Sequence, residues 1–165
     1  MLAYADHIEG LSYEDVFVLD LLTGQRRRLT RASSEEEYGS DLAISPDGQQ
    51  VAYEWITPDG SRELRLIGTD GLGLRALYRN PGVHRIFPKR WSLDGKHILA
   101  ILWREDQTHR IALLSAADGS VRVVKSLQGG DPWTQAMSLS PDGRWIAYSS
   151  NESGRREIYV RPYPG

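Results

Sequence analysis

The four histidines are the first residues to test for chemistry, because imidazole serves both as a metal ligand and as a general base. They lie far apart, at His7, His84, His97 and His109, without the i, i+4 pairing of metal-binding helices. The sequence contains no Gly-x-Ser-x-Gly nucleophile elbow and none of the His-Arg-Asp or Asp-Phe-Gly motifs of kinases. We therefore expect no catalytic residue, metal site or cofactor, with His97 on a strand surface and His84 and His109 in loops.

Closely spaced glycines occur in "GTDGLGLR", from Gly68 to Arg75. They have neither Walker nor dinucleotide-binding spacing, and no helical pattern follows them, which favours a hairpin turn over a phosphate-binding loop. The chain has no cysteine, so disulfides and thiolate metal sites are excluded and the compartment stays open. No run approaches about 18 apolar residues, and "MLAYADHIEG" lacks the regions of a signal peptide. We expect no membrane insertion.

The charges are nearly balanced, with 20 Lys plus Arg against 22 Asp plus Glu in 165 residues. Such a chain has enough length for one core and no global field that would attract nucleic acid. The local runs Arg26 to Arg28 and Glu35 to Glu37 are most simply a solvated strand edge and a solvated loop.

One short pattern occurs three times, as "SPDGQQVAY", "SLDGKHILA" and "SPDGRWIAY". Proline sets the φ angle for a type I turn, aspartate bonds to its own turn backbone, and glycine takes the left-handed conformation. An apolar run rich in branched and aromatic residues follows each turn and predicts a strand. The predicted turn residues are Ser45, Pro46, Asp47 and Gly48, then Ser92, Asp94 and Gly95, and then Ser140, Pro141, Asp142 and Gly143.

The spacing of these turns reveals a repeat, because Gly48, Gly95 and Gly143 are 47 and 48 residues apart. The segments "DVFVLD", "ELRLIG", "RIALLS" and "EIYVRP" recur at intervals of 48, 47 and 47 residues. Four antiparallel strands in a repeat of about 47 residues indicate a blade of a β-propeller.

The sequence therefore predicts an all-β fold, a single partial β-propeller segment over residues 1–165 with about four four-stranded antiparallel blades. The repeats span about 1–32, 38–79, 84–127 and 132–165, the first lacking its inner strand and the last its outer strand. Inner strands are expected to begin at Asp41, Phe87 and Ala136. Because a ring normally uses four to eight complete blades, we expect an arc whose open faces are covered by remaining blades or by self-association.

These repeats resemble the WD40-like repeats called PD40, found in the propeller of TolB and in prolyl oligopeptidase relatives. The pattern Ser-Pro-Asp-Gly, apolar strand, loop and Glu-Ile-Tyr-Val matches from Ser140 to Val160, whereas Leu93 replaces proline in the middle copy. The last 26 residues, with "SNESG" and "YVRP", also resemble propellers fused downstream of bacterial serine/threonine kinases. The resemblance implies a sensor or scaffold role and favours an extracytoplasmic or periplasmic location.

Loops on one end of a propeller are its usual docking surface. Here they are expected at 31–40, 80–85, 103–109 and 151–157, and around Trp133 in "QGGDPW". The candidate contact residues are Trp133, Arg85, Arg104, Arg155 and Arg156. The other tryptophans are predicted to pack between blades, namely Trp55, Trp91, Trp103 and Trp145.

The predicted function is a non-catalytic module that binds a protein, peptide or small ligand on this loop face. The leading hypothesis is the sensor or interaction part of a larger bacterial serine/threonine kinase-type protein. Two alternatives remain open. A gating propeller of a prolyl oligopeptidase-like serine peptidase would have a Gly-x-Ser-x-Gly motif downstream, and a TolB-like periplasmic envelope protein would have an export signal upstream.

Overall fold

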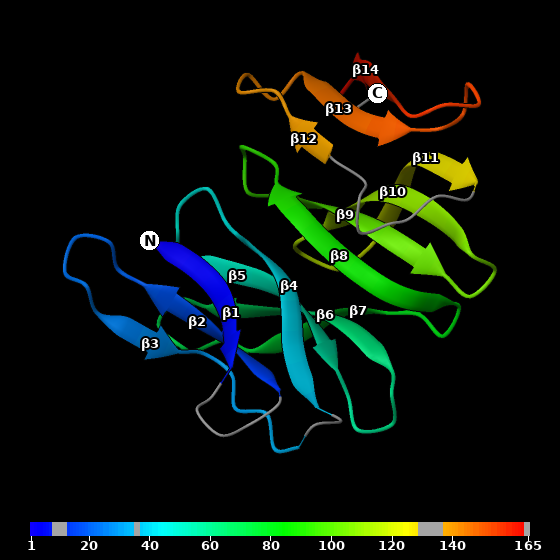
Figure 1. Ribbon diagram of the computed structural model, residues 1–165. Helices are drawn as coiled ribbons and strands as arrows, with labels where there is room; N and C mark the ends of the chain where they lie inside the picture. Colours follow the sequence, from blue (N-terminus) through cyan, green and yellow to red (C-terminus); the bar gives the residue numbers. More distant parts are fainter. Residues whose placement is uncertain (8–12, 35–36, 129–136, 164–165) are drawn as a thin grey trace.

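The computed structural model describes residues 1–7, 13–34, 37–128 and 137–163, and all its regular elements in these ranges are β-strands. The strands form four separate antiparallel sheets that follow one another along the chain (Figure 1). Each sheet is a meander in which strands adjacent in sequence are adjacent in space. None of the described residues belongs to a helix that could cross a membrane.

The strand bounds of the four sheets are as follows. Sheet 1 contains β1 (Leu2–His7), β2 (Glu14–Leu19) and β3 (Arg26–Arg28). Sheet 2 contains β4 (Tyr38–Ile44), β5 (Gln50–Ile56), β6 (Arg62–Gly68) and β7 (Arg75–Arg79). Sheet 3 contains β8 (Val83–Trp91), β9 (His97–Arg104), β10 (Thr108–Ser115) and β11 (Val121–Gln128). Sheet 4 contains β12 (Met137–Leu139), β13 (Trp145–Ser150) and β14 (Glu157–Pro162).

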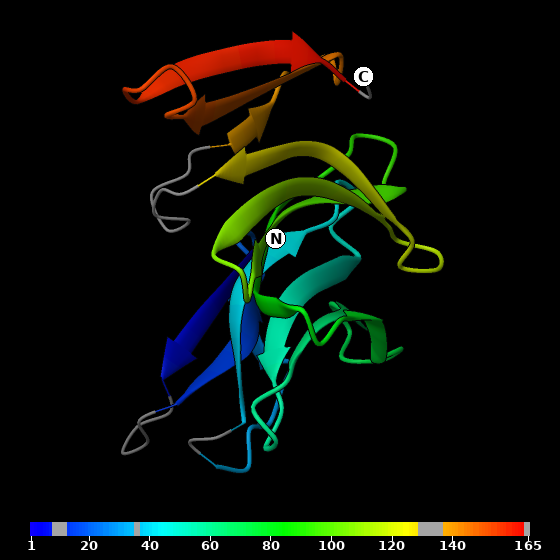
Figure 2. The same ribbon diagram turned by 90° about the vertical axis from the view of Figure 1, so that its right-hand side faces the viewer.

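The sheets pack face to face, as blades do, and the view in Figure 2 shows sheet 4 above sheet 3. The first strands of neighbouring four-stranded sheets, β4 and β8, contact one another, and β12 contacts β8. Two four-stranded sheets between two three-stranded sheets confirm the predicted partial β-propeller, with incomplete first and last blades.

The Ser-x-Asp-Gly turns share one hydrogen-bonded geometry. Gly48, Gly95 and Gly143 have φ angles of 71°, 68° and 67°, which glycine adopts without a steric penalty. In the first turn the Ser45 hydroxyl donates to Asp47 (2.5 Å), and Asp47 accepts the N–H of Gln49 (3.0 Å). The middle turn keeps both bonds, at 2.6 and 3.0 Å, although Leu93 stands in place of proline. The serine and aspartate side chains therefore maintain the turn without proline.

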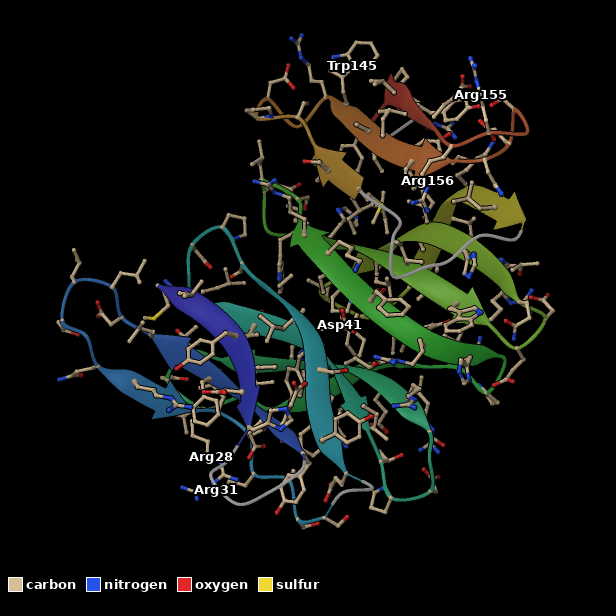
Figure 3. All side chains as sticks on the ribbon, viewed as in Figure 1. Arg28, Arg31, Asp41, Trp145, Arg155 and Arg156 are labelled. Carbon is tan, nitrogen blue, oxygen red and sulfur yellow. The ribbon has the colours of Figure 1, made fainter. Side chains whose placement is uncertain are left out.

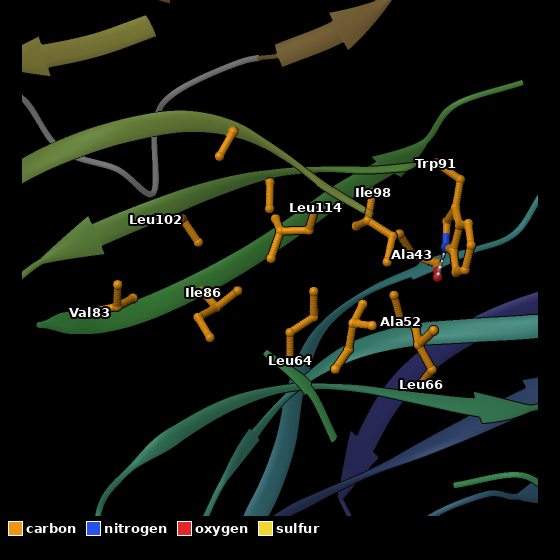
Figure 4. Close-up of a cluster of buried hydrophobic side chains, with 13 residues drawn as sticks. Ala43, Ala52, Leu64, Leu66, Val83, Ile86, Trp91, Ile98, Leu102 and Leu114 are labelled. Atoms are coloured by element: carbon orange, nitrogen blue, oxygen red, sulfur yellow. Dashed lines mark hydrogen bonds between the residues drawn. The ribbon is translucent and has the colours of Figure 1, made fainter. Parts of the chain in front are cut away.

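Buried apolar side chains fill the spaces between sheets. The largest cluster joins sheets 2 and 3 and includes Leu64, Leu66, Ile86 and Ile98 (Figure 4). The Trp91 indole N–H donates across this interface to the Ala43 carbonyl (2.9 Å). Because apolar burial contributes about 25 cal/mol per Å², each blade depends on its neighbour for much of its stability.

The run Arg26 to Arg28 forms the edge strand β3, and Arg26 and Arg27 are exposed as predicted, but the arginines of this run also make specific contacts. The Arg27 guanidinium donates to the Thr69 carbonyl in sheet 2 (3.1 Å), and Arg28 forms an ion pair with the fully buried Asp15. A further arginine, Arg75, bonds in the same way to backbone carbonyls of the 116–117 turn in sheet 3. Arginines on outer strands therefore tie sheet 1 to sheet 2 and sheet 2 to sheet 3, which composition alone did not indicate.

The lowered pKa values of the turn aspartates determine how the stability of the fold should depend on pH. The N–H of Ser120 and the hydroxyls of Ser115 and Ser120 lower the pKa of Asp118 to about 2, and serine hydroxyls likewise lower the pKa of Asp47, Asp94 and Asp142. A carboxyl with a lower pKa in the folded state stabilises the fold above its unfolded pKa of about 4. This contribution is lost as pH falls toward the folded value. We expect the urea midpoint of unfolding to drop between about pH 4 and pH 2, and to drop less in Asp118→Asn. An equally steep drop in that variant would contradict the stabilising role of the Asp118 carboxylate.

Candidate functional site

A polar pocket of about 320 Å³ lies next to two of the loop segments named from the sequence, 80–85 and 103–109, and next to the β5–β6 loop, which was not named there. We define this loop face by the β5–β6 loop (57–61), the β7–β8 connection (80–82) and the β9–β10 loop (105–107). The pocket lies between sheets 2 and 3, with walls from all three loops and from the first residues of β8. Its walls are mostly polar or charged, which favours a polar ligand or a peptide over an apolar one.

Arg79 is the best-fixed cation of the pocket wall. Its Nη2 donates to Asp59 Oδ2 (2.9 Å) and to the Ser61 hydroxyl (2.7 Å), and its Nη1 lies 3.6 Å from Glu63 Oε1. The Thr57 hydroxyl and the Ser61 N–H hold the pKa of Asp59 well below its usual range. The guanidinium is thus positioned at the rim while its side chain remains half exposed.

His84 lies on β8 beside this pocket, and not in a loop as the sequence predicted. Its ring meets Trp103 edge to face, with centroids 4.8 Å apart, and its Nδ1 is 3.9 Å from Glu105 Oε1. The side chain is 46% exposed. An imidazole held between an indole and a carboxylate can donate to or accept from a ligand at the pocket mouth.

A buried ionic cluster lies close to the pocket, between sheets 2 and 3. Glu54 is fully buried and accepts bonds from Arg85 Nε (2.7 Å), the Ile86 N–H (2.7 Å) and the Ser40 hydroxyl (3.1 Å). Burial raises the pKa of Glu54, against the opposing charges of Arg85 and then Arg62. Arg62 itself lines the pocket.

The same cluster extends to Asp41, which Figure 3 shows between β4 and β8. Arg85 Nη2 lies 3.2 Å from Asp41 Oδ2, and Lys89 Nζ lies 4.0 Å from Oδ1. Asp41 has a φ angle of 35° at a register shift between Ser40 and Leu42. A positive φ costs energy for a residue other than glycine, and the ion pairs hold this bulge in place.

The structure changes the position of several predicted contacts. β8 begins at Val83, four residues before the expected Phe87, because the chain turns tightly at Asn80. The side-chain Oδ1 of Asn80 accepts the N–H of Gly82, and its backbone carbonyl accepts the N–H of Val83. Arg85 therefore lies on a strand with its side chain only 13% exposed, and it belongs to the buried cluster and not to a loop. β4 also starts earlier than expected, at Tyr38.

The other predicted contacts are spread over different blades. Arg104 ends β9 and pairs with Asp106 (3.0 Å), and Arg155, 82% exposed, pairs with Glu157 (2.8 Å) in the last blade. Arg156 is exposed beside it (Figure 3). Trp133 lies outside the described residues. These side chains are not gathered into one site with Arg85.

Two further expectations were wrong. His109 is buried in β10 and not in a loop, since its strand passes between two others. Trp145 is 45% exposed and does not pack between blades. Trp55, Trp91 and Trp103 do lie against neighbouring side chains, with Trp55 and Trp91 almost fully buried. Among the described residues, no group of three His, Asp or Glu side chains is arranged to hold a metal ion.

The sequence analysis missed Arg79 and the buried Glu54, and it placed His84 in a loop of the expected face without choosing it as a contact residue. A weak signal existed for Glu54, since a carboxylate interrupts the apolar strand "VAYEWI" where the next repeat has Ile101. No local sequence signal indicated Arg79, because its partners Asp59 and Ser61 lie about 20 residues earlier, in the β5–β6 loop, and approach it only in the folded sheet.

Comparison with known proteins places the fold. No family model matches the sequence. The uncharacterized protein Atu1656 of Agrobacterium fabrum is 30% identical over 121 residues, which cover 73% of this chain and 39% of that protein. The crystal structure of TolB from Acinetobacter baumannii superposes on 98% of the chain with a TM-score of 0.70 and 22% identity, over 38% of its own length.

A prolyl endopeptidase structure is similar to the same degree, with a TM-score of 0.71 and 18% identity over 99% of this chain and 26% of its own. The chain thus spans about two fifths or less of the length of these relatives. At these identities the likeness concerns architecture. The chain forms consecutive blades of a β-propeller of the kind seen in TolB and prolyl endopeptidases.

Proposed function

We propose that the chain is a non-catalytic binding module of a longer polypeptide and that it presents its loop face to a protein, peptide or small polar ligand. The observation that carries this proposal is the polar pocket between sheets 2 and 3, where Arg79, His84 and Glu105 come together from three separate elements. A fixed guanidinium and a half-exposed imidazole offer hydrogen-bond donors to a polar partner.

Within this proposal, the leading assignment is the sensor or interaction part of a bacterial serine/threonine kinase-type protein. Its support is the likeness of the last 26 residues to kinase-fused propellers. Similarity to prolyl endopeptidase and TolB structures supports the two alternatives, a gating propeller and an envelope protein. Reading the complete polypeptide separates the three, through a kinase domain upstream, a Gly-x-Ser-x-Gly motif downstream, or an export signal followed by further repeats.

The loop face is tested by site-specific photo-crosslinking in the full-length protein in its native cells. A photoreactive residue at His84 should capture a partner, whereas the same residue at Leu72 should not. Leu72 is 70% exposed and lies in a turn on the opposite face, between β6 and β7, which makes it a matched control. Capture at Leu72 and not at His84 would overturn the proposal. Crosslinking at His84 that is unchanged by Arg79→Ala would also overturn it.

A further inference from the structure

The charged residues that line the pocket between sheets 2 and 3 divide into those that are already paired and those that are not. Arg79 and Asp59 form an ion pair at 2.9 Å, and Glu63 places a second carboxylate 3.6 Å from Arg79 Nη1. Because these groups neutralise one another, they offer a ligand hydrogen bonds and little net charge. Two other lining residues, of opposite sign, are Arg62 and Glu105.

Arg62, the first residue of β6, is a cation of the sheet 2 wall without a close counterion. Among the described residues it forms no ion pair, and its Nη1 is buried without a hydrogen-bond partner. Its charge acts on Glu54 only at longer range, since that carboxylate already accepts bonds from Arg85 and the Ile86 N–H. A partly buried guanidinium in this state is costly, and an anionic group that enters the pocket would compensate its charge.

Glu105 is the corresponding acid of the sheet 3 wall. It lies in the β9–β10 loop, where its N–H donates to the Gly82 carbonyl (3.3 Å). Its side chain is 64% exposed, and within the described parts of the chain its one charged neighbour is His84, at 3.9 Å. The carboxylate therefore has acceptor capacity left for a donor on a ligand.

The two residues line one pocket, and no ion pair joins them. They belong to different blades, so the packing of sheets 2 and 3 holds a positive and a negative group apart. A ligand with a single charge would be attracted by one of these groups and repelled by the other. A ligand that carries both a carboxylate and an ammonium group satisfies both. The volume of about 320 Å³ is at the lower end of the range for ligand pockets and favours a small molecule.

We propose that this pocket binds a small zwitterion, whose carboxylate pairs with Arg62 and whose ammonium group pairs with Glu105. A free amino acid and a short peptide with unblocked termini share this chemistry. The inference rests on the proposed function, because it names the ligand of the same loop face. Arg79 and His84 add hydrogen bonds beside the two charged contacts. Since the ligand touches both sheets, its binding also stabilises the interface between them.

The first test is titration calorimetry of the full-length protein with glycine, diglycine and triglycine, which separate the same two charges by increasing distances. At least one should bind, and the length that binds most tightly distinguishes an amino acid from a peptide as the ligand. N-acetylation or C-terminal amidation of that probe should each weaken binding about tenfold or more, because each removes one charge-assisted contact. Absence of binding by all three probes would overturn the proposal, as would equal binding of blocked and unblocked probes.

The second test assigns each charge of the ligand to one wall. In Glu105→Gln, acetylation of the probe should no longer matter, whereas amidation should still weaken binding; Arg62→Gln should show the reverse. Glu14→Gln is the matched control, because Glu14 lies 3.6 Å from His7 in sheet 1, a similar pair away from the pocket. Equal losses in Glu14→Gln and Glu105→Gln would contradict the assignment. If Arg62→Gln fails to fold, Glu105→Gln still decides, since its side chain is mostly exposed.

The zwitterion site and the loop face can fail separately. Capture of a protein by the photoreactive residue at His84, with no binding of the glycine probes, would overturn the zwitterion site and leave the loop face as a binding surface. Absence of both the crosslink and the binding would overturn the proposed function as well.

Discussion

Replacing Glu54 by alanine is expected to lower the free energy of unfolding by about 3–5 kcal/mol, the usual effect of removing one partner of a buried ion pair. The reason is that Arg85, only 13% exposed, would keep its charge in the interface between sheets 2 and 3 without its closest carboxylate. The N–H of Ile86 would lose its acceptor as well. Urea denaturation followed by tryptophan fluorescence measures the change.

Two further variants separate charge from packing. Glu54→Leu combined with Arg85→Met removes both charges and is expected to recover most of the loss, because a buried ion pair is often replaceable by apolar residues of similar volume. Arg144→Ala removes a surface pair with Asp142, in which the arginine is 77% exposed, and should change stability by less than about 1 kcal/mol. A double variant as unstable as Glu54→Ala would contradict the role of the unpaired charge and assign the loss to the hydrogen bonds that Glu54 accepts from the Ile86 N–H and the Ser40 hydroxyl.

The architecture was accessible from the sequence because it depends on periodic local signals. The turn at Ser45 to Gly48 is encoded by residues within hydrogen-bonding reach of one another, and its recurrence fixes the period of the blade. Continuous apolar runs then assign strands such as β9 and β10, which are buried on both faces. Such signals predict which elements exist and in what order.

The pocket and the ionic cluster were not accessible in the same way, because they form between blades. Glu54 meets Arg85 of the next sheet across 31 residues, and within sheet 2 Arg79 meets Asp59 across 20. No local preference determines those pairings. The same holds for Trp145, whose strand pattern matches that of buried residues although its face is open. Sequence periodicity predicts the blade, while the partner of each side chain depends on how neighbouring blades pack.

Gly119→Ala is expected to show how tightly two blades approach one another. Gly119 has a φ angle of 72°, which costs other residues about 1–2 kcal/mol. An added Cβ would also overlap the backbone carbonyl of Leu77 on β7 of sheet 2, so the two blades would have to separate locally. Overpacking of this kind costs about 1–3 kcal/mol more, giving an expected total of about 2–5 kcal/mol in urea denaturation.

Gly24→Ala is the matched control, because Gly24 occupies the corresponding turn of sheet 1. Its φ angle is 73°, and a Cβ there would meet nothing within 4 Å. This variant is expected to lose only about 1–2 kcal/mol of unfolding free energy, the cost of a positive φ angle at a residue other than glycine. The difference between the two variants then measures the cost of the close approach between Gly119 and Leu77. Equal losses would mean that the turn relaxes freely, and that the contact between β7 and the 115–119 turn does not hold sheets 2 and 3 together.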